Sequence, residues 1–143
     1  MLAEISNRCD AIEQCYEFML AYAAQGLPSD RGSNSGAQVR DFLRRAVHAL
    51  TGLAESCAMA VKEDGLEPAD KYLAFLAVLD RDARDSLAAI ELVLAQPAIS
   101  SQLIDNLNAS IHLRALLTDL FLLDEIVKKL PTPARPVVAG ESE

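Results

Sequence analysis

Apolar residues recur every three or four positions along most of the chain, which is the spacing of one face of an α-helix. Glycine and proline interrupt this pattern at 26–28, 65–68 and 96–97, and again from 131 onward. The pattern predicts four helices, over about 2–25, over about 36–63, from Pro68 to the break at 96–97, and over about 101–130. Ser33, Asn34 or Ser35 is expected to cap the second helix, since short polar side chains accept hydrogen bonds from free amide groups there.

The connections between these helices are short, so neighbouring helices should run antiparallel. We therefore predict an all-α fold, an antiparallel up-down four-helix bundle that forms one domain over residues 1–130. The remaining stretch, 131–143, has the sequence PTPARPVVAGESE. Its high proline content and few large apolar side chains predict a flexible tail.

The predicted fourth helix is apolar around more of its circumference than the others. Leu103, Leu107 and Ile111 form one apolar face, and a second apolar face follows it. Three neighbours in a small bundle would leave part of such a helix bare. We therefore predict a homo-oligomer, a dimer in the simplest case, in which a second subunit covers Leu113, Leu116, Leu117, Leu120, Phe121 and Leu123.

Composition and charge limit the possible partners. Hydrophobic residues make up 51% of the chain, aromatic residues only 5%, and there is no tryptophan, which favours packed helices over sheets. The formal net charge of -8 would repel a nucleic-acid backbone or an anionic membrane, so neither is expected as a partner. An acidic row, Asp10, Glu13 and Glu17, follows one side of the first predicted helix and is interpreted as its solvated face rather than as a metal or partner surface.

The three cysteines, Cys9, Cys15 and Cys57, are an odd number without CxxC spacing. This pattern argues against a disulfide framework and against a zinc site. Cys9 and Cys57 fall on predicted core faces, whereas Cys15 is expected at the flank. The first ten residues include Glu4 and Arg8, where a secretory signal would need an unbroken apolar run. A cytoplasmic protein with reduced thiols is the resulting prediction.

Residue patterns that carry catalytic or metal chemistry are not evident in the sequence. A di-iron carboxylate bundle needs Glu-x-x-His pairs, but Arg45 precedes His48 by three residues and Ala109 precedes His112 by three. No Gly-rich turn precedes a helix, and no nucleophile and base form a convincing pair. We therefore expect a non-enzymatic protein without metal or cofactor. A cofactor- or metal-binding bundle is the least favoured alternative.

One surface of the predicted second helix carries a histidine followed one turn later by a glycine, His48 and Gly52. A turn of about 100° per residue places His48 about 160–180° from the centre of the apolar stripe, so the imidazole should face water. Gly52 costs a helix about 1 kcal/mol relative to alanine, and its bare backbone would let another protein approach the ring. Charged side chains are expected around His48 on the same face, namely Asp41, Arg44, Arg45 and Glu55.

The residues His48, Leu50, Gly52 and Ala54, preceded by the run LRRAV, resemble the signature of histidine-phosphotransfer domains. These four-helix bundles relay phosphoryl groups between response-regulator receivers. The resemblance implies that His48 accepts a phosphoryl group while Arg44 or Arg45 neutralises the developing charge. The chain departs from the family at Thr51, where the family usually has lysine. The structural alternative is a surface histidine beside a glycine that accommodates a close crossing helix.

Two classes of function follow from these patterns. The first is a protein-interaction module, such as an adaptor, assembly factor or regulatory subunit, that presents a helix face to a protein partner. Phe18 and Tyr22 lie away from the apolar stripe of the first helix and are candidate anchors for that partner, or else contacts inside the oligomer. The second class is phosphorelay through His48.

Overall fold

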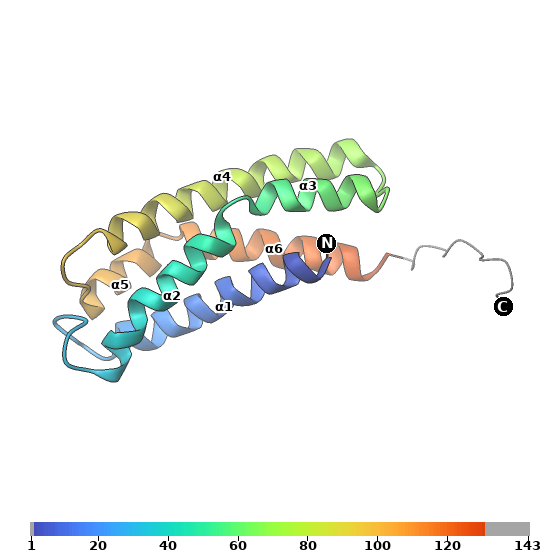
Figure 1. Cartoon of the computed structure of the whole chain (residues 1–143). Helices are drawn as coiled ribbons and strands as arrows, with labels where there is room; N and C mark the ends of the chain where they lie inside the picture. The colour runs from blue at the N-terminus through green and yellow to red at the C-terminus, as the bar shows by residue number, and fades with distance from the viewer. Residues whose placement is uncertain (1, 131–143) are drawn as a thin grey trace, which may run out of the picture.

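The computed structural model describes residues 2–130, and the regular secondary structure in this range is all helical (Figure 1). The all-α prediction is confirmed. The predicted tail, 131–143, lies outside the described residues. The helices are α1 (Leu2–Ala24), α2 (Asn34–Leu50), α3 (Leu53–Glu63), α4 (Ala69–Leu94), α5 (Ser101–Ala109) and α6 (His112–Lys128).

Two of the predicted helices are each broken into two. The helix predicted over 36–63 ends at Leu50 and restarts at Leu53, because Gly52 adopts a left-handed conformation with φ 76°. The helix predicted over 101–130 breaks before α6, where Ile111 has φ 65°. A left-handed residue redirects the chain and ends the helical hydrogen-bond ladder. The prediction of four continuous helices is therefore wrong at these two points.

The breaks determine which helices pack together. The main neighbours of α1 are α2 and α5, whereas α3 and α6 pack mainly on α4. Figure 1 shows α3 alongside α4, displaced from the line of α2. The N-terminal half of α1 is therefore less thickly covered than its C-terminal half.

The core is continuous and apolar, and its aromatic member is Tyr22. This side chain is fully buried, and its hydroxyl donates a hydrogen bond to the Ile99 carbonyl at 2.6 Å. The Ser101 hydroxyl donates to the Tyr22 carbonyl at 2.6 Å, and the Leu27 amide donates to that hydroxyl oxygen at 2.8 Å. These bonds join the end of α1 to the start of α5, so a buried polar group is satisfied where two connections meet.

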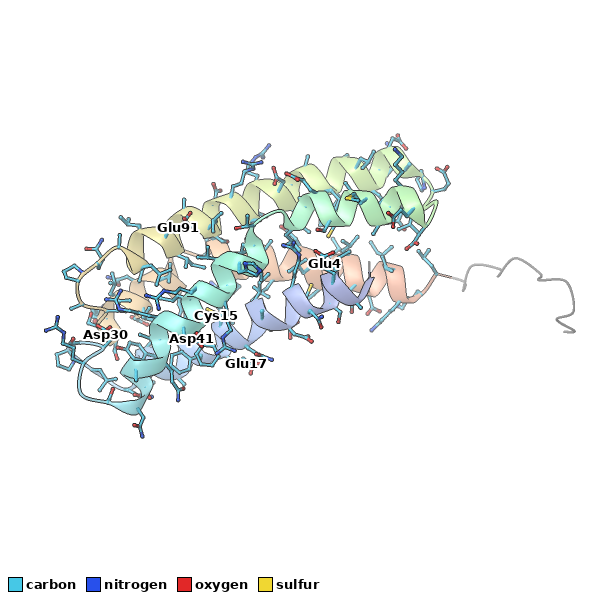
Figure 2. The ribbon with its side chains drawn as sticks, in the orientation of Figure 1. Glu4, Cys15, Glu17, Asp30, Asp41 and Glu91 are labelled. Carbon is cyan, nitrogen blue, oxygen red and sulfur yellow. The ribbon has the colours of Figure 1, made fainter. Side chains whose placement is uncertain are left out.

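A second polar cluster closes the same end of the molecule around Asp30 (Figure 2). The Asp30 carboxylate accepts hydrogen bonds from the Ile99 amide and from Arg40 Nε, both at 2.8 Å. These bonds hold the pKa of Asp30 below its usual value. The other Arg40 nitrogens donate to the carbonyls of Leu94, at 3.0 Å, and Gln96, at 2.8 Å, which satisfies the C-terminal end of α4.

The predicted cap of α2 is Ser33, whose hydroxyl oxygen accepts a hydrogen bond from the Gly36 amide at 2.9 Å. Within residues 2–130, none of the helices has the combination of length and hydropathy needed to cross a bilayer.

Candidate functional site

A groove opens where α1, α3 and α6 diverge, and we call it the α1–α3–α6 groove. It encloses about 460 Å³. Its position follows from the packing, because α3 and α6 turn toward α4 and leave the N-terminal half of α1 between them. Seven of the side chains that line it are large and apolar: Ile5 from α1, Val61 from α3, Leu66 from the turn after α3, and Leu120, Phe121, Leu123 and Val127 from α6.

Acidic side chains from three helical segments also line this groove. Asp10 and Glu13 come from α1, Asp64 from the end of α3, and Asp124 from α6. Among the described residues that line the groove, Lys128 is the only basic one, and its Nζ is ion-paired with Glu125 at 2.7 Å. The groove therefore combines apolar walls with a surplus of negative charge.

The carboxylates of the groove affect one another. Partial burial raises the pKa of Glu13, and the nearby negative charges of Asp10, Glu17 and Asp124 raise it further. Glu13 is therefore more costly to ionise beside these carboxylates than it would be alone. A cation placed among them would relieve this repulsion.

Two thiols, Cys9 and Cys57, also line the groove. Burial raises the pKa of each to about 11, and proximity to Cys57 and to Glu13 contributes to the shift at Cys9. Both thiols are therefore protonated at neutral pH, and a protonated thiol is a poor nucleophile and a poor metal ligand. Cys15 of α1, which is labelled in Figure 2, is fully buried, so its expected position at the flank is wrong. Burial raises its pKa to about 12.

Large apolar side chains remain exposed on α6. Phe121 is 53% exposed and contributes to the groove lining, whereas Leu122 and Ile126, which are 50% and 43% exposed, do not line the groove and lie on the opposite side of the helix. An exposed apolar side chain at the edge of a concave apolar surface is typical of protein contact sites. Leu123, which the sequence placed in the same interface, is half-buried and lines the groove.

The other leucines predicted at a subunit interface lie in the core of the single chain. Leu113, Leu116, Leu117 and Leu120 are all buried, because α6 packs on α4 and also contacts α1 and α5. Three elements, α4, α1 and α5, contact this helix, and α5 is one of them because the break at Ile111 places it beside α6 as a separate element. The expectation that a second subunit must cover these four leucines is wrong.

Phe18 and Tyr22 are not exposed anchors either. Phe18 is half-buried, with its ring stacked on Phe42 at a centroid distance of 4.3 Å. Tyr22 is fully buried in the core. Both rings pack against other elements of the same chain, so their proposed role as partner anchors is corrected to core packing. The acidic groove residues that the sequence did not indicate are Asp64 and Asp124.

The prediction that His48 faces water is confirmed, since its side chain is exposed in the last turn of α2. It borders a shallow depression of about 640 Å³ between α1 and α2, which Arg8, Arg44 and Arg45 also line. Arg45 is ion-paired with Asp41 at 3.0 Å. Arg8 is ion-paired with Glu4 at 3.0 Å and donates hydrogen bonds to the carbonyls at the end of α2. Two of the three guanidinium groups near His48 are thus already engaged.

Gly52 does not lie on the same helix as His48. Its left-handed φ explains the choice of glycine, because an L side chain in this conformation is strained. No atom other than its chain neighbours lies within 4 Å of the position that a Cβ would occupy. The alternative that Gly52 makes room for a crossing helix is therefore wrong.

Asp119 of α6 and Asp82 of α4 form a carboxylate pair away from the groove. Burial, a hydrogen bond shared with Asp82 and the negative charge of Asp82 raise the pKa of Asp119 to about 7. One Asp119 oxygen, Oδ2, is buried without a hydrogen-bond partner. A proton on Asp119 allows the two carboxyl groups to remain close.

This pair predicts a pH-dependent stability. Between pH 4 and about pH 7 the unfolded chain has lost the Asp119 proton and the folded chain still holds it, so the free energy of unfolding should fall as the pH rises through this range. Asp119→Asn should flatten that slope and raise the free energy of unfolding at pH 8 by about 1 kcal/mol, a value reduced for partial solvent screening. Urea unfolding at a series of pH values from 4 to 8 measures the free energy of unfolding and its slope with pH. Asp105→Asn, at an exposed position of α5, is the control and should leave the slope intact.

Among residues 2–130, no group of three or more His, Cys, Asp or Glu side chains is placed to hold a metal ion. Comparisons with known proteins add no functional information, since no family model, curated protein or solved structure matches the chain. Inference about function therefore rests on the geometry of the chain itself.

Proposed function

We propose that the protein is a non-enzymatic protein-interaction module, an adaptor, assembly factor or regulatory subunit that binds another polypeptide in the α1–α3–α6 groove. The observation that carries the proposal is a concave surface formed by large apolar side chains, among which Phe121 is 53% exposed. Burial of these side chains by a partner would be favourable, at about 25 cal/mol per Å² of apolar surface.

The chemistry of the groove favours binding over catalysis. Its two thiols have pKa values of about 11, and its carboxylates lie beside apolar side chains without a histidine among the described lining residues. General acid–base chemistry at neutral pH needs a group that titrates near neutrality. The raised pKa of Asp119 belongs to the α4–α6 contact and not to the groove.

In this proposal the molecule is an up-down bundle with four helical segments. Two of them are the continuous helices α1 and α4. The other two are interrupted helices, α2 followed by α3 and α5 followed by α6. The breaks at Gly52 and Ile111 have a functional role, because they turn α3 and α6 toward α4 and so open the groove. The homo-oligomer predicted from the sequence would then have to use the exposed side of α6, around Phe121, rather than the buried leucines.

A photo-crosslinking experiment tests the proposal. A benzophenone amino acid at position 121 should form adducts heavier than the 15.5 kDa chain in cells of the native host. The same residue at position 92 is the control, since Leu92 on α4 is 67% exposed and lies outside the groove. Mapping of the crosslink should place one defined partner segment at position 121. Equal adducts at both positions, or none at 121, would refute the groove as a binding site.

The second candidate is histidine phosphotransfer through His48. It is favoured by the exposed imidazole beside a depression that three arginines line. Two features oppose it: the position of His48 in the last turn of α2, where the helix dipole is negative, and the presence of Thr51 in place of the family's lysine. Thr51 is the C-cap of α2 and its hydroxyl donates to the Val47 carbonyl at 2.7 Å.

Intact mass spectrometry decides between the candidates. The protein is incubated with a phosphorylated receiver domain or with phosphoramidate, and its mass is measured before and after mild acid. Phosphotransfer requires an acid-labile gain of one phosphoryl group that is lost in His48→Gln. The interaction module predicts no gain.

A further inference from the structure

We infer that the partner segment that occupies the α1–α3–α6 groove is a basic amphipathic helix of a different protein. The inference rests on the proposed function and narrows it to one class of ligand. The charge and the shape of the groove carry it.

The charge of the groove calls for a cationic partner. Asp10, Glu13, Asp64 and Asp124 converge on it from α1, α3 and α6. Lys128 lies near Asp124 but is ion-paired with Glu125, so one shared basic side chain faces these four carboxylates and a surplus of negative charge remains. The whole chain also carries a formal net charge of -8, so its field attracts a cationic segment from a distance and speeds association.

The apolar lining calls for a partner with an apolar face. Val61, Leu66 and Leu123 lie in a groove of about 460 Å³, with Phe121 beside them. A helix that docks into such a groove inserts apolar side chains at positions i, i+3 or i+4, and i+7, and its flanking positions meet the rim. Lysine or arginine at the flanking positions would meet carboxylates from three helical segments. Apolar burial would then supply affinity, and the charges would supply specificity.

Two other possible occupants of the groove, a second copy of this chain and its own segment 131–143, complement the negative charge of the groove less well. In a symmetric dimer through this face, the same carboxylates of two copies would be brought together, since a two-fold interface uses the same patch twice. The segment 131–143 follows α6 in the sequence, but it contains Glu141 and Glu143 against a single basic residue, Arg135. Like charges placed opposite one another across an interface are unfavourable.

Binding of designed peptides tests the inference with the intact chain. The probe is a fluorescent 18-residue helix with leucine on one face and lysine on the other, and its twin carries glutamate in place of every lysine. We expect micromolar binding of the lysine peptide by fluorescence anisotropy and at least tenfold weaker binding of the twin. The double variant Asp10→Lys/Asp124→Lys should also bind the lysine peptide at least tenfold more weakly.

A matched control separates the groove from the overall charge. Asp85→Lys/Asp105→Lys makes the same change in net charge at exposed positions on α4 and α5 that do not line the groove. It should weaken binding less than threefold at physiological salt, where screening acts over about 8 Å. Circular dichroism confirms that both double variants are folded.

The inference is overturned if the control variant loses as much affinity as the groove variant, or if the glutamate twin binds equally well. It is also overturned if a peptide of residues 131–143 competes for the groove, or if sedimentation shows a dimer that Asp10→Lys/Asp124→Lys strengthens. A crosslink from position 121 to an acidic partner segment would refute the basic helix and leave the interaction function standing. Absence of any crosslink would refute both.

Discussion

Gly36→Ala should lower the free energy of unfolding by about 3 kcal/mol. Alanine is normally the better helix former, by about 1 kcal/mol, so the helix alone would predict stabilisation. The opposite sign is expected because a Cβ at position 36 would overlap backbone atoms of Asp30. Rotation of a flexible side chain cannot relieve this overlap, so the backbone itself would have to shift. Thermal unfolding followed by circular dichroism should show a midpoint lower by roughly 10 °C.

The position of Asp30 explains why the effect should be large. Its carboxylate holds both Arg40 and the Ile99 amide, and Arg40 in turn satisfies carbonyls at the end of α4. A displaced Asp30 backbone would disturb this whole cluster, and buried polar groups that lose their partners are costly.

Gly32→Ala provides the control for this prediction. Gly32 also lies in the α1–α2 connection, with φ 84°, but nothing lies within 4 Å of its Cβ position. Only the left-handed conformation should then cost free energy, about 1 kcal/mol. If Gly36→Ala were neutral or stabilising, the close approach of Asp30 to α2 would be contradicted.

The sequence predicts the helical class and the outer limits of the helices well. The stops at Gly26, Gly65 and Pro97 and the cap at Ser33 are local signals, and each depends only on neighbouring residues. The breaks at Gly52 and Ile111 are harder to predict, since the apolar spacing continues across both of them. A glycine was visible at the first break, but a β-branched residue rarely adopts a left-handed conformation, so no local signal marks Ile111.

The candidate site was predicted only in part. The sequence placed Phe121 and Leu123 on a surface that another polypeptide covers, which remains a prediction. It interpreted the acidic row Asp10, Glu13 and Glu17 as a solvated face rather than as part of a site, whereas Asp10 and Glu13 line the groove. It could not bring Asp64 and Asp124 to the same place, because their convergence depends on how α3 and α6 turn toward α4. Contacts between helices that are far apart in the chain produce no periodic pattern of residues in a single sequence, so they could not be predicted from it.

Leu116→Ala separates a core role from an interface role on α6. Leu116 is fully buried within the single chain, so its truncation should lower the free energy of unfolding by about 3 kcal/mol through lost apolar burial and the cavity left behind. Urea unfolding at two protein concentrations measures this loss. The loss should be independent of concentration, because the contacts are made inside one chain.

The matched variant is Leu122→Ala, which makes the same chemical change at a side chain that is 50% exposed. Its effect on unfolding should stay within about 0.5 kcal/mol, as for most surface substitutions. It should also leave the crosslinked complex formed at position 121 unchanged, since Leu122 lies on the side of α6 opposite to the residues that line the groove. If Leu116→Ala dissociated an oligomer without unfolding the chain, Leu116 would belong to a subunit interface. The assignment of the partner surface of α6 to the region around Phe121 would then be wrong.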